Sequence, residues 1–238
     1  MLSKIENFDT IDKKEKKHIK KVLKKINYAI TVEEYDLQIL TIRKNASITI
    51  QNFIYRFETE IMKKNVGLAR GFLMRNNYLT PINRKYKNRF LIVRDPIKRF
   101  ISFINWPLPI LYKKYNVESF IFFFENFIKM YKTDFIFFTH VLPQNELLSD
   151  LTLNSFSKIY KFEKISKLEK KLQKVLKTDL TFNHINGSSI IRTTPFTLKE
   201  LHKNHLDFLF EFYKEDYKFL KDFYNKDKIY KEWKKLTK

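Results

Sequence analysis

The segment FLIVRDPIKRFISFI (90–104) combines a strand, a turn and the start of a helix. The run RFLIV (89–93) is short and apolar, which is typical of a buried strand. Asp95 and Pro96 come next, and they are favoured residues at the cap and at the first position of a helix. Arg94 therefore lies at the carboxyl end of a strand, where open α/β sheets bind their ligands.

Further strands and helices are predicted on both sides of this segment. Short apolar runs predict strands, and apolar side chains at helical spacing predict helices. The predicted strands are LQILTIR (37–43), DFIFFTH (134–140) and SKIYKFE (157–163). The predicted helices cover residues 49–62, 117–130, 166–176 and 198–233. This alternation predicts an α/β fold around a mainly parallel sheet.

The stretch IDKKEKKHIKKVLKKINY (11–28) places apolar residues at helical spacing among lysines. It predicts a basic amphipathic helix, which could lie on an anionic membrane surface or cap the core. Residues 63–87 are irregular and basic and are predicted to form a loop. Since no repeat or long linker interrupts the chain, we expect one domain over residues 1–238, with its core within 37–220.

Composition restricts the partners and the cellular setting. The formal net charge of +21 favours polyanionic partners such as nucleic acid, acidic lipid, acidic glycan or a phosphorylated nucleotide. The alternative is that the excess lysine only keeps the surface soluble. The chain has no cysteine, which excludes disulfides and thiolate metal sites. Because it also lacks a signal-peptide segment and an apolar run long enough to span a membrane, we expect a soluble cytoplasmic protein.

The segment IRKNASITIQNF (42–53) is another strand-to-helix junction, where free backbone N–H groups and the positive end of a helix can bind phosphate. The small side chains of Ala46 and Ser47 would let an oxyanion approach the backbone. Lys44 adds a charge, and Ser47 and Thr49 add hydroxyl donors. It is not a Walker A loop, since the two glycines are missing and the lysine precedes the loop. Taken alone, the segment is weak evidence for a phosphate site, and an ordinary turn with a surface lysine explains it better.

The opening segment contains a second possible anion site. Ser102 lies two helical turns beyond Asp95 and so on nearly the same helix face. Arg94 offers a planar fork of donors and Ser102 a hydroxyl, which together suit a phosphate. Arg99, one turn before Ser102, could support the same anion or only pair with Asp95.

In series, these segments resemble the sulfotransferases that use 3′-phosphoadenosine-5′-phosphosulfate (PAPS), in particular the carbohydrate sulfotransferases of the family 2 type and their bacterial relatives. KNASIT (44–49) is similar to their 5′-phosphosulfate loop, and RDPIKRFIS (94–102) is similar to their 3′-phosphate motif. Four further segments resemble family elements in the same order: HVLPQ (140–144), KFEKI (161–165), HING (184–187) and FYKEDYKFL (212–220).

The resemblance implies a three-layer α/β/α fold like that of the P-loop NTPases. It also implies transfer of a sulfuryl group from PAPS to a hydroxyl of a carbohydrate or glycoconjugate, with 3′,5′-adenosine bisphosphate (PAP) as product and no metal. Lys44 would neutralise the leaving 5′-phosphate, and Arg94 and Ser102 would hold the 3′-phosphate. The implied donor-binding residues are Lys44, Asn45, Ala46, Ser47, Thr49, Arg94 and Ser102.

The chain departs from this family in several respects. Ile48 occupies a loop position where a small or hydroxyl residue is common, and the loop has no glycine. The luminal eukaryotic members carry a membrane anchor and disulfides, and this chain shows neither. We expect donor binding to survive these changes, whereas the identity of the acceptor does not transfer.

The acceptor hydroxyl needs a general base. His140, at the end of a predicted strand, is our first candidate, since a histidine with an ordinary pKa of about 6.5 is neutral and available at neutral pH. The alternative is a histidine bonded structurally at a strand end. Family members also use a glutamate, which here would be Glu58 or Glu60. By the same resemblance, we expect His184 and Asn186 to border the donor or acceptor pocket.

Three other functions remain open at this point. A basic, aromatic-rich protein could bind nucleic acid, although the lysines are spread along the chain and no recognition motif stands out, so we expect no specific nucleic-acid partner. A kinase of related architecture would need a Walker lysine and carboxylates for Mg²⁺ near the loop, and neither is evident. A relative that binds the nucleotide without catalysis is compatible with the same residues.

Overall fold

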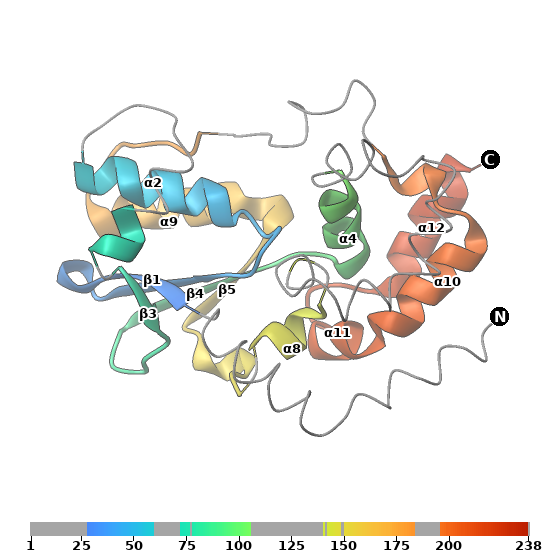
Figure 1. Cartoon of the computed structure of the whole chain (residues 1–238), viewed down its shortest axis with the longest axis horizontal. Helices are drawn as coiled ribbons and strands as arrows, with labels where there is room; N and C mark the ends of the chain where they lie inside the picture. Colours follow the sequence, from blue (N-terminus) through green and yellow to red (C-terminus); the bar gives the residue numbers. More distant parts are fainter. Residues whose placement is uncertain are drawn as a thin grey trace.

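The computed structural model describes residues 28–59, 72–76, 78–105, 140, 142–148, 150–183 and 196–237. Within these ranges the protein is a mixed α/β structure with one open sheet (Figure 1). The strands are β1 (Tyr28–Val32), β2 (Leu37–Thr41), β3 (Leu79–Pro81), β4 (Asn88–Val93) and β5 (Lys158–Lys161). Their order in the sheet is β3-β1-β2-β4-β5.

The sheet is parallel in its central part and antiparallel at one edge. β2 pairs with β4, and β4 pairs with β5, both in parallel. β1 forms antiparallel ladders with β2 and with β3. Because parallel strands end at the same edge of a sheet, the residues that follow β2, β4 and β5 are brought together there.

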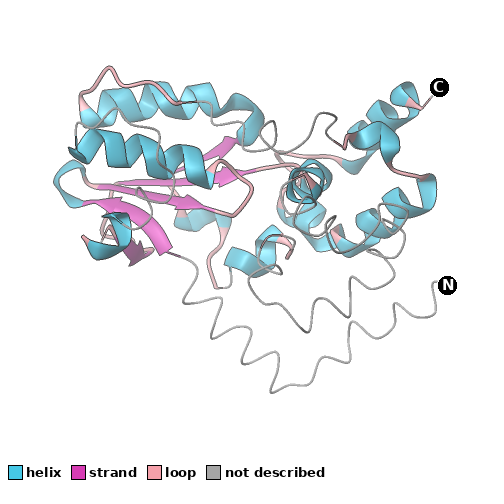
Figure 2. Ribbon diagram, turned by 45° about the horizontal axis from the view of Figure 1, so that its top comes forward, coloured by secondary structure: helices cyan, strands magenta, loops and turns pink. Residues whose placement is uncertain are grey.

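A helix follows each of the parallel strands. The helices after β2, β4 and β5 are α2 (Ser47–Thr59), α4 (Pro96–Ile104) and α9 (Ile165–Leu176). The short α8 (Gln144–Leu148) precedes β5. The C-terminal helices α10 (Lys203–Phe212), α11 (Lys214–Phe219) and α12 (Lys226–Leu236) gather at the opposite end of the molecule from α2 and α9 (Figures 1 and 2). The described residues also form the short 3-10 turns η2 (Glu33–Tyr35), η4 (Leu153–Ser155), η5 (Phe162–Lys164) and η6 (Leu198–Glu200).

The start of α4 follows the capping rules that the sequence indicates. Asp95 is the N-cap, and its Oδ1 accepts hydrogen bonds from the N–H groups of Ile97 (3.0 Å) and Lys98 (3.1 Å). Pro96 occupies the first helical position, where the missing N–H costs nothing. Tyr217 of α11 places its hydroxyl 3.3 Å from Oδ2 of Asp95, so the cap is also tied to the C-terminal helices.

Successive side chains of the strands belong to two separate hydrophobic clusters. Along β4, Phe90 and Ile92 belong to one cluster, and Leu91 and Val93 belong to the other, as the two-residue repeat of a strand requires. The first cluster includes the buried residues of α2 and α9, and the second includes those of α4, α8 and the C-terminal helices. Both clusters therefore hold the helices against the parallel strands. We call the edge of the sheet where these strands end its carboxyl edge.

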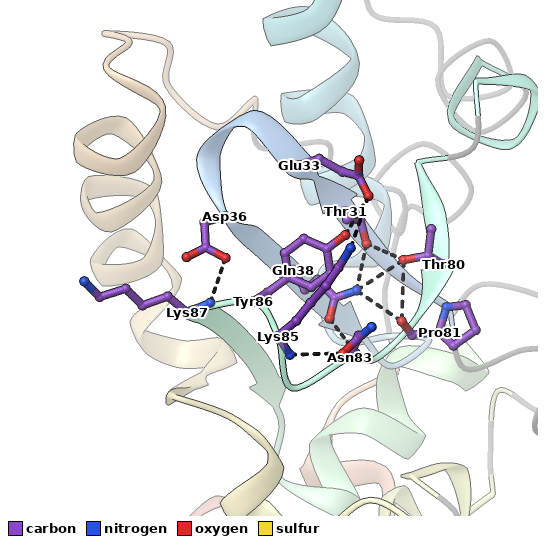
Figure 3. Close-up of polar contacts among 10 residues, drawn as sticks. All are labelled: Thr31, Glu33, Asp36, Gln38, Thr80, Pro81, Asn83, Lys85, Tyr86 and Lys87. Atoms are coloured by element: carbon purple, nitrogen blue, oxygen red, sulfur yellow. Dashed lines mark hydrogen bonds and ion pairs between the residues drawn. The ribbon is translucent and has the colours of Figure 1, made fainter.

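A buried polar cluster joins the antiparallel strands at the amino-end side of β2 (Figure 3). The Nε2 of Gln38 donates to the hydroxyls of Thr31 (3.0 Å) and Thr80 (3.2 Å) and to the carbonyl oxygen of Pro81 (3.1 Å). Its Oε1 accepts from the N–H of Asn83 at 2.8 Å. Since an unpaired buried amide costs about 1–3 kcal/mol, these bonds fix the relative positions of β1, β2 and β3.

The α/β class and three of the predicted strands are confirmed, with small changes of boundary at 37–43, 89–93 and 157–163. The prediction of a mainly parallel sheet holds only for its central part, because β1 and β3 were not foreseen. The predicted loop 63–87 contains β3, and the predicted helix 11–28 is wrong at Tyr28, which begins β1. The backbone of β3 is stabilised by β1, about fifty residues earlier in the chain, which a local pattern does not reveal. β1 also pairs with the nearby β2.

The remaining predictions concern the extent of the core and elements that fall outside the described residues. The hydrophobic core extends beyond residues 37–220, since Ala29 and Ile229 are buried in it. The rest of the helix 11–28, the helix 117–130 and the strand 134–140, apart from His140, lie outside the described residues. None of the helices within the described ranges combines the length and the hydropathy that crossing a membrane requires.

Candidate functional site

The loop between β2 and α2 holds two residues with a Cβ in the left-handed region. Lys44 has φ 69° and Ala46 has φ 63°. This conformation costs such residues about 1–2 kcal/mol each. Between them, the N–H of Asn45 donates to the carbonyl oxygen of Ile42 at 2.9 Å. The segment predicted to bind phosphate is therefore a tight, strained turn that leads directly to Ser47 at the positive end of α2.

Ala46→Gly tests this backbone conformation. Glycine adopts positive φ without the Cβ clash but is more flexible in the unfolded chain, so we expect the free energy of unfolding to be unchanged or to rise by up to about 1 kcal/mol. Ala29→Gly is the matched control, since Ala29 is fully buried in β1. That change should lower the free energy of unfolding by about 1–2 kcal/mol. Urea unfolding measures both variants, and equal destabilisation would contradict the left-handed turn.

Arg94 follows β4 directly, and its guanidinium is held from two sides. Its Nη1 donates to the carbonyl oxygen of Lys44 at 3.0 Å, and its central carbon lies 4.1 Å from the centre of the Phe162 ring. Burial lowers the pKa of Arg94 to about 10, which leaves the group cationic at neutral pH. Its Nε is buried and has no hydrogen-bond partner among the described residues. Because an unpaired buried N–H costs about 1–3 kcal/mol, a ligand oxygen at this position would be stabilising.

Lys44, Arg94 and Arg99 concentrate positive charge at the carboxyl edge of the sheet. Burial, followed by the charges of Arg94 and Arg99, lowers the pKa of Lys44 to about 7. A bound anion would offset both the lost hydration and the repulsion and would raise this pKa again. Side chains with strongly shifted pKa values are common at functional sites, and this cluster favours an anionic ligand.

Arg99 holds the loop after β2 through a hydrogen bond to its backbone. Its side chain is fully buried, its Nε donates to the carbonyl oxygen of Arg43 at 3.0 Å, and its Nη1 donates to that of Leu142 at 2.6 Å. The sequence left two roles open for Arg99: support of the anion at Arg94, or pairing with Asp95. The two hydrogen bonds above go to backbone carbonyl oxygens and not to Asp95, which caps α4. Arg99 instead ties the loop after β2 to the residues before α8.

Gln144 is the centre of a buried network that joins the two predicted phosphate segments. Its Oε1 accepts from Nδ2 of Asn45 (2.7 Å) and from the N–H of Arg94 (3.1 Å), and its Nε2 donates to the carbonyl oxygen of Arg94 (2.7 Å). Asp216 caps α8 by accepting from the N–H groups of Gln144 and Asn145, both at 2.8 Å. The network fixes the position of Lys44 relative to Arg94, although 50 residues separate them in the chain.

No hydrogen bond between described residues joins the predicted hydroxyl residues Ser47, Thr49 and Ser102 to Gln144, Asn45 or Arg94. Ser47 and Thr49 are half-buried in the first turn of α2, next to the loop. Ser102 is half-buried in α4, and no hydrogen bond between described residues joins it to Arg94. Ile48, the residue that departs from the family pattern, is exposed beside Ser47 and Thr49. The structure therefore joins Arg94 directly to Lys44 and, through Gln144, to Asn45, and leaves the hydroxyl groups outside these hydrogen bonds.

His140 forms a hydrogen bond with Arg43, whose Nη1 lies 2.8 Å from Nε2 of the imidazole. A guanidinium can only donate, so Nε2 accepts. Burial, followed by the charges of Arg43, Lys44 and Arg99, lowers the pKa of His140 to about 3. The imidazole is therefore neutral at neutral pH, but it is a weak base in this arrangement and its Nε2 lone pair is occupied.

The alternative bases are differently placed. Glu58 lies eleven residues after Ser47 in α2, which corresponds to about 16 Å along the helix axis. Its Oε2 accepts from the hydroxyl of Tyr78 at 2.6 Å. Glu60, His184 and Asn186 lie outside the described residues.

Sequence reasoning named the segments that hold Gln144 and Asp216 but not what these residues do, and it did not foresee the contact of Arg43 with His140. The signal for the first two was their place in HVLPQ and FYKEDYKFL; Arg43 carried no signal beyond its position after β2. Tyr224 also contributes near Arg94. Its hydroxyl donates a hydrogen bond of 2.7 Å to Glu163, the residue after Phe162. Within the described ranges, no group of three or more histidine or acidic side chains is arranged to hold a metal ion.

The site thus consists of a strained loop at the start of α2, a guanidinium with an unpaired buried N–H, and a buried amide network that joins them. Comparison with protein-family models, with curated proteins and with solved structures finds no match for this chain.

Proposed function

We propose that this protein is a sulfotransferase that moves the sulfuryl group of PAPS to a hydroxyl of a carbohydrate or glycoconjugate, with PAP as the second product. The observation that carries the proposal is the position of Arg94. Its guanidinium lies at the carboxyl edge of the parallel strands, is bonded to the Lys44 loop, and keeps a buried Nε without a partner among the described residues. A donor with phosphate groups on both the 3′ and the 5′ oxygen of its ribose would use such a pair of linked cationic segments.

Each segment has its own task in this proposal. Arg94, with Ser102, binds the 3′-phosphate and thereby sets the register of the donor. Lys44 and the N–H groups at the start of α2 face the 5′-phosphosulfate. The acceptor oxygen attacks sulfur in line, the bond from sulfur to the bridging phosphate oxygen breaks, and the 5′-phosphate of PAP leaves with one more negative charge. Lys44 stabilises that charge, which makes it the group most directly linked to the rate.

The proton of the acceptor hydroxyl has to reach a base. His140 stays our candidate, but its role requires Arg43 to release Nε2, because the imidazole has no lone pair to offer while Arg43 donates to it. Release of Arg43 would also remove the nearest charge that lowers the pKa of His140. Glu58 is the less suitable alternative, since it lies near the other end of α2 and is bonded to Tyr78.

The proposal includes the finer fold, a three-layer α/β/α arrangement similar to that of the P-loop NTPases. The division of the strand residues into two hydrophobic clusters supports it, since α2 and α9 share one cluster and α4 and the C-terminal helices share the other. The loop after β2 supports it as well, because it turns directly into a helix N-terminus as a phosphate loop does.

Thermal unfolding with different nucleotides tests the donor site. At 100 times its dissociation constant, PAP should add about 2.7 kcal/mol to the free energy of unfolding, which corresponds to a rise in melting temperature of about 5–10 °C for a chain of this size. AMP and ATP at the same concentration should raise it far less, because only a 3′-phosphate can use Arg94.

The decisive quantity is the difference in melting temperature between the protein with PAP and the protein with AMP or ATP. Inorganic phosphate at matched ionic strength is the control for general anion binding. Equal stabilisation by ATP and PAP would favour a kinase-like protein and remove the sulfotransferase proposal.

A further inference from the structure

Exposed lysines form a line along the outer side of α9, and we call them the α9 lysine stripe. Intervals of three or four residues place them on one side of the helix. The opposite side carries Leu168, Leu172 and Leu176, which are buried in the core. The twelve residues of α9 span about 18 Å. The stripe consists of Lys164, Lys167, Lys170, Lys174 and Lys177.

Helix stability does not explain this arrangement. Among the ion pairs between described residues, none includes a lysine of the stripe. Glu169, the acidic residue of α9, accepts a hydrogen bond from the N–H of Phe182 instead. Lys164 and Lys167 lie at the positive end of the helix, and like charges three and four residues apart repel each other. A bound polyanion would relieve both effects.

The stripe begins at the donor site. β5 pairs with β4 so that Lys161 lies next to Val93. The next residues of the two strands are Phe162 and Arg94, and the guanidinium of Arg94 stacks on the Phe162 ring. Lys164 follows two residues later. α9 then runs beside α2 on one side of the sheet (Figures 1 and 2). An extended ligand on the stripe would therefore lead to the edge where Arg94 and Lys44 lie.

Lysine exposure by itself does not single out α9, because α12 has a similar line of Lys228, Lys231 and Lys235. That line lies at the opposite end of the molecule, as both ribbon views show (Figures 1 and 2). Its helix also carries Asp227 and Glu232. The position next to the donor site is what distinguishes the α9 stripe, and α12 provides a control with the same chemistry.

We propose that the α9 lysine stripe binds an acidic polysaccharide and guides one of its hydroxyls to the donor site. This inference rests on the proposed function, since it names the class of acceptor. α9 has no aromatic residue on which unpaired bases could stack. The exposed large apolar side chains of the described residues are Ile48, Met74 and Leu236, so α9 presents none that could insert into a membrane. A hydrated, regularly charged sugar chain fits the stripe better than either of these polyanions.

The test compares two triple variants that each remove three charges. K167Q/K170Q/K174Q alters the stripe, and K228Q/K231Q/K235Q alters α12; glutamine keeps a helix propensity close to that of lysine. The probes are an oligogalacturonate long enough to span α9, dextran of equal length, a single-stranded oligonucleotide, and vesicles with phosphatidylserine. We expect the α9 variant to bind oligogalacturonate about tenfold more weakly at low salt, since lost charge contacts reduce polyanion affinity steeply. The α12 variant should bind like the unchanged protein, and both should bind PAP normally and keep the melting temperature.

Each alternative result is decisive. Equal losses in the two variants would overturn the inference, as they would show a general charge effect. Tighter, stripe-dependent binding of the oligonucleotide or of the vesicles would overturn it in favour of that partner. PAP binding without oligogalacturonate binding removes only this inference. Stripe-dependent oligogalacturonate binding without PAP binding removes the proposed function and leaves α9 as a glycan-binding surface. If the triple variant unfolds, Lys170→Gln and Lys231→Gln repeat the comparison with single changes.

Discussion

Replacing Lys44 with alanine should lower the turnover of sulfuryl transfer by about 10²–10³-fold, the range found when a donor to a developing oxyanion is removed. PAP affinity should fall much less, because the charge on the 5′-phosphate increases only as the bond to sulfur breaks. Alanine is a clean replacement, since it has a Cβ like lysine and so retains the cost of the φ of 69° at this position. Transfer of labelled sulfate under single-turnover conditions measures the effect.

Lys98→Ala is the matched control for Lys44→Ala. Lys98 lies in the first turn of α4 and forms a partly exposed ion pair with Glu232 at 2.9 Å, a contact of a kind that contributes little to stability. Its loss should leave turnover within about twofold of the unchanged protein. Full turnover in the Lys44→Ala protein would mean that residues 44–49 do not form the phosphosulfate loop.

Replacing Arg94 with alanine should weaken PAP binding by about 10- to 150-fold, which corresponds to the loss of a charge-assisted contact of about 1.5–3 kcal/mol. In the proposed mechanism this contact exists before and during transfer, so the effect should fall on affinity more than on turnover. Arg94→Lys should recover only part of the affinity, because lysine keeps the charge but lacks the planar fork that donates to Lys44 and, in the proposed complex, to a phosphate at once. Calorimetric titration with PAP measures all three proteins.

The change at Arg94 also removes the bond to the Lys44 loop, so melting temperatures without ligand are needed beside the titrations. A variant that loses PAP affinity at an unchanged melting temperature places the effect in the ligand contact. Unchanged PAP affinity in a folded Arg94→Ala protein would show that the unpaired Nε is not a phosphate donor, and the proposed donor site would be wrong.

Local signals were enough to predict the elements that lead to the site. β2 and β4 are mainly apolar runs, and β5 contains Ile159 and Tyr160, which favour strands. The Asp95-Pro96 pair marks the start of α4 by rules that involve only neighbouring residues. β3 was not predicted because it has only three residues and pairs with β1 residues about fifty positions earlier in the chain. β1 also pairs with the nearby β2, so distance in the chain does not account for it. Short strands are stabilised by their partners in the sheet more than by their own composition.

The sequence by itself determined which residues follow the parallel strands, and thereby that Lys44 and Arg94 meet at one edge of the sheet. Only the tertiary structure decided their chemical state. Gln144 links Asn45 to Arg94 across 99 and 50 residues of chain, and Arg43 engages His140 across 97. Hydration and hydrogen bonds at these positions depend on segments that the chain brings together only when it folds. The lowered pKa values of Lys44 and His140 arise first from burial, a property of the packed molecule that no local pattern of residues contains.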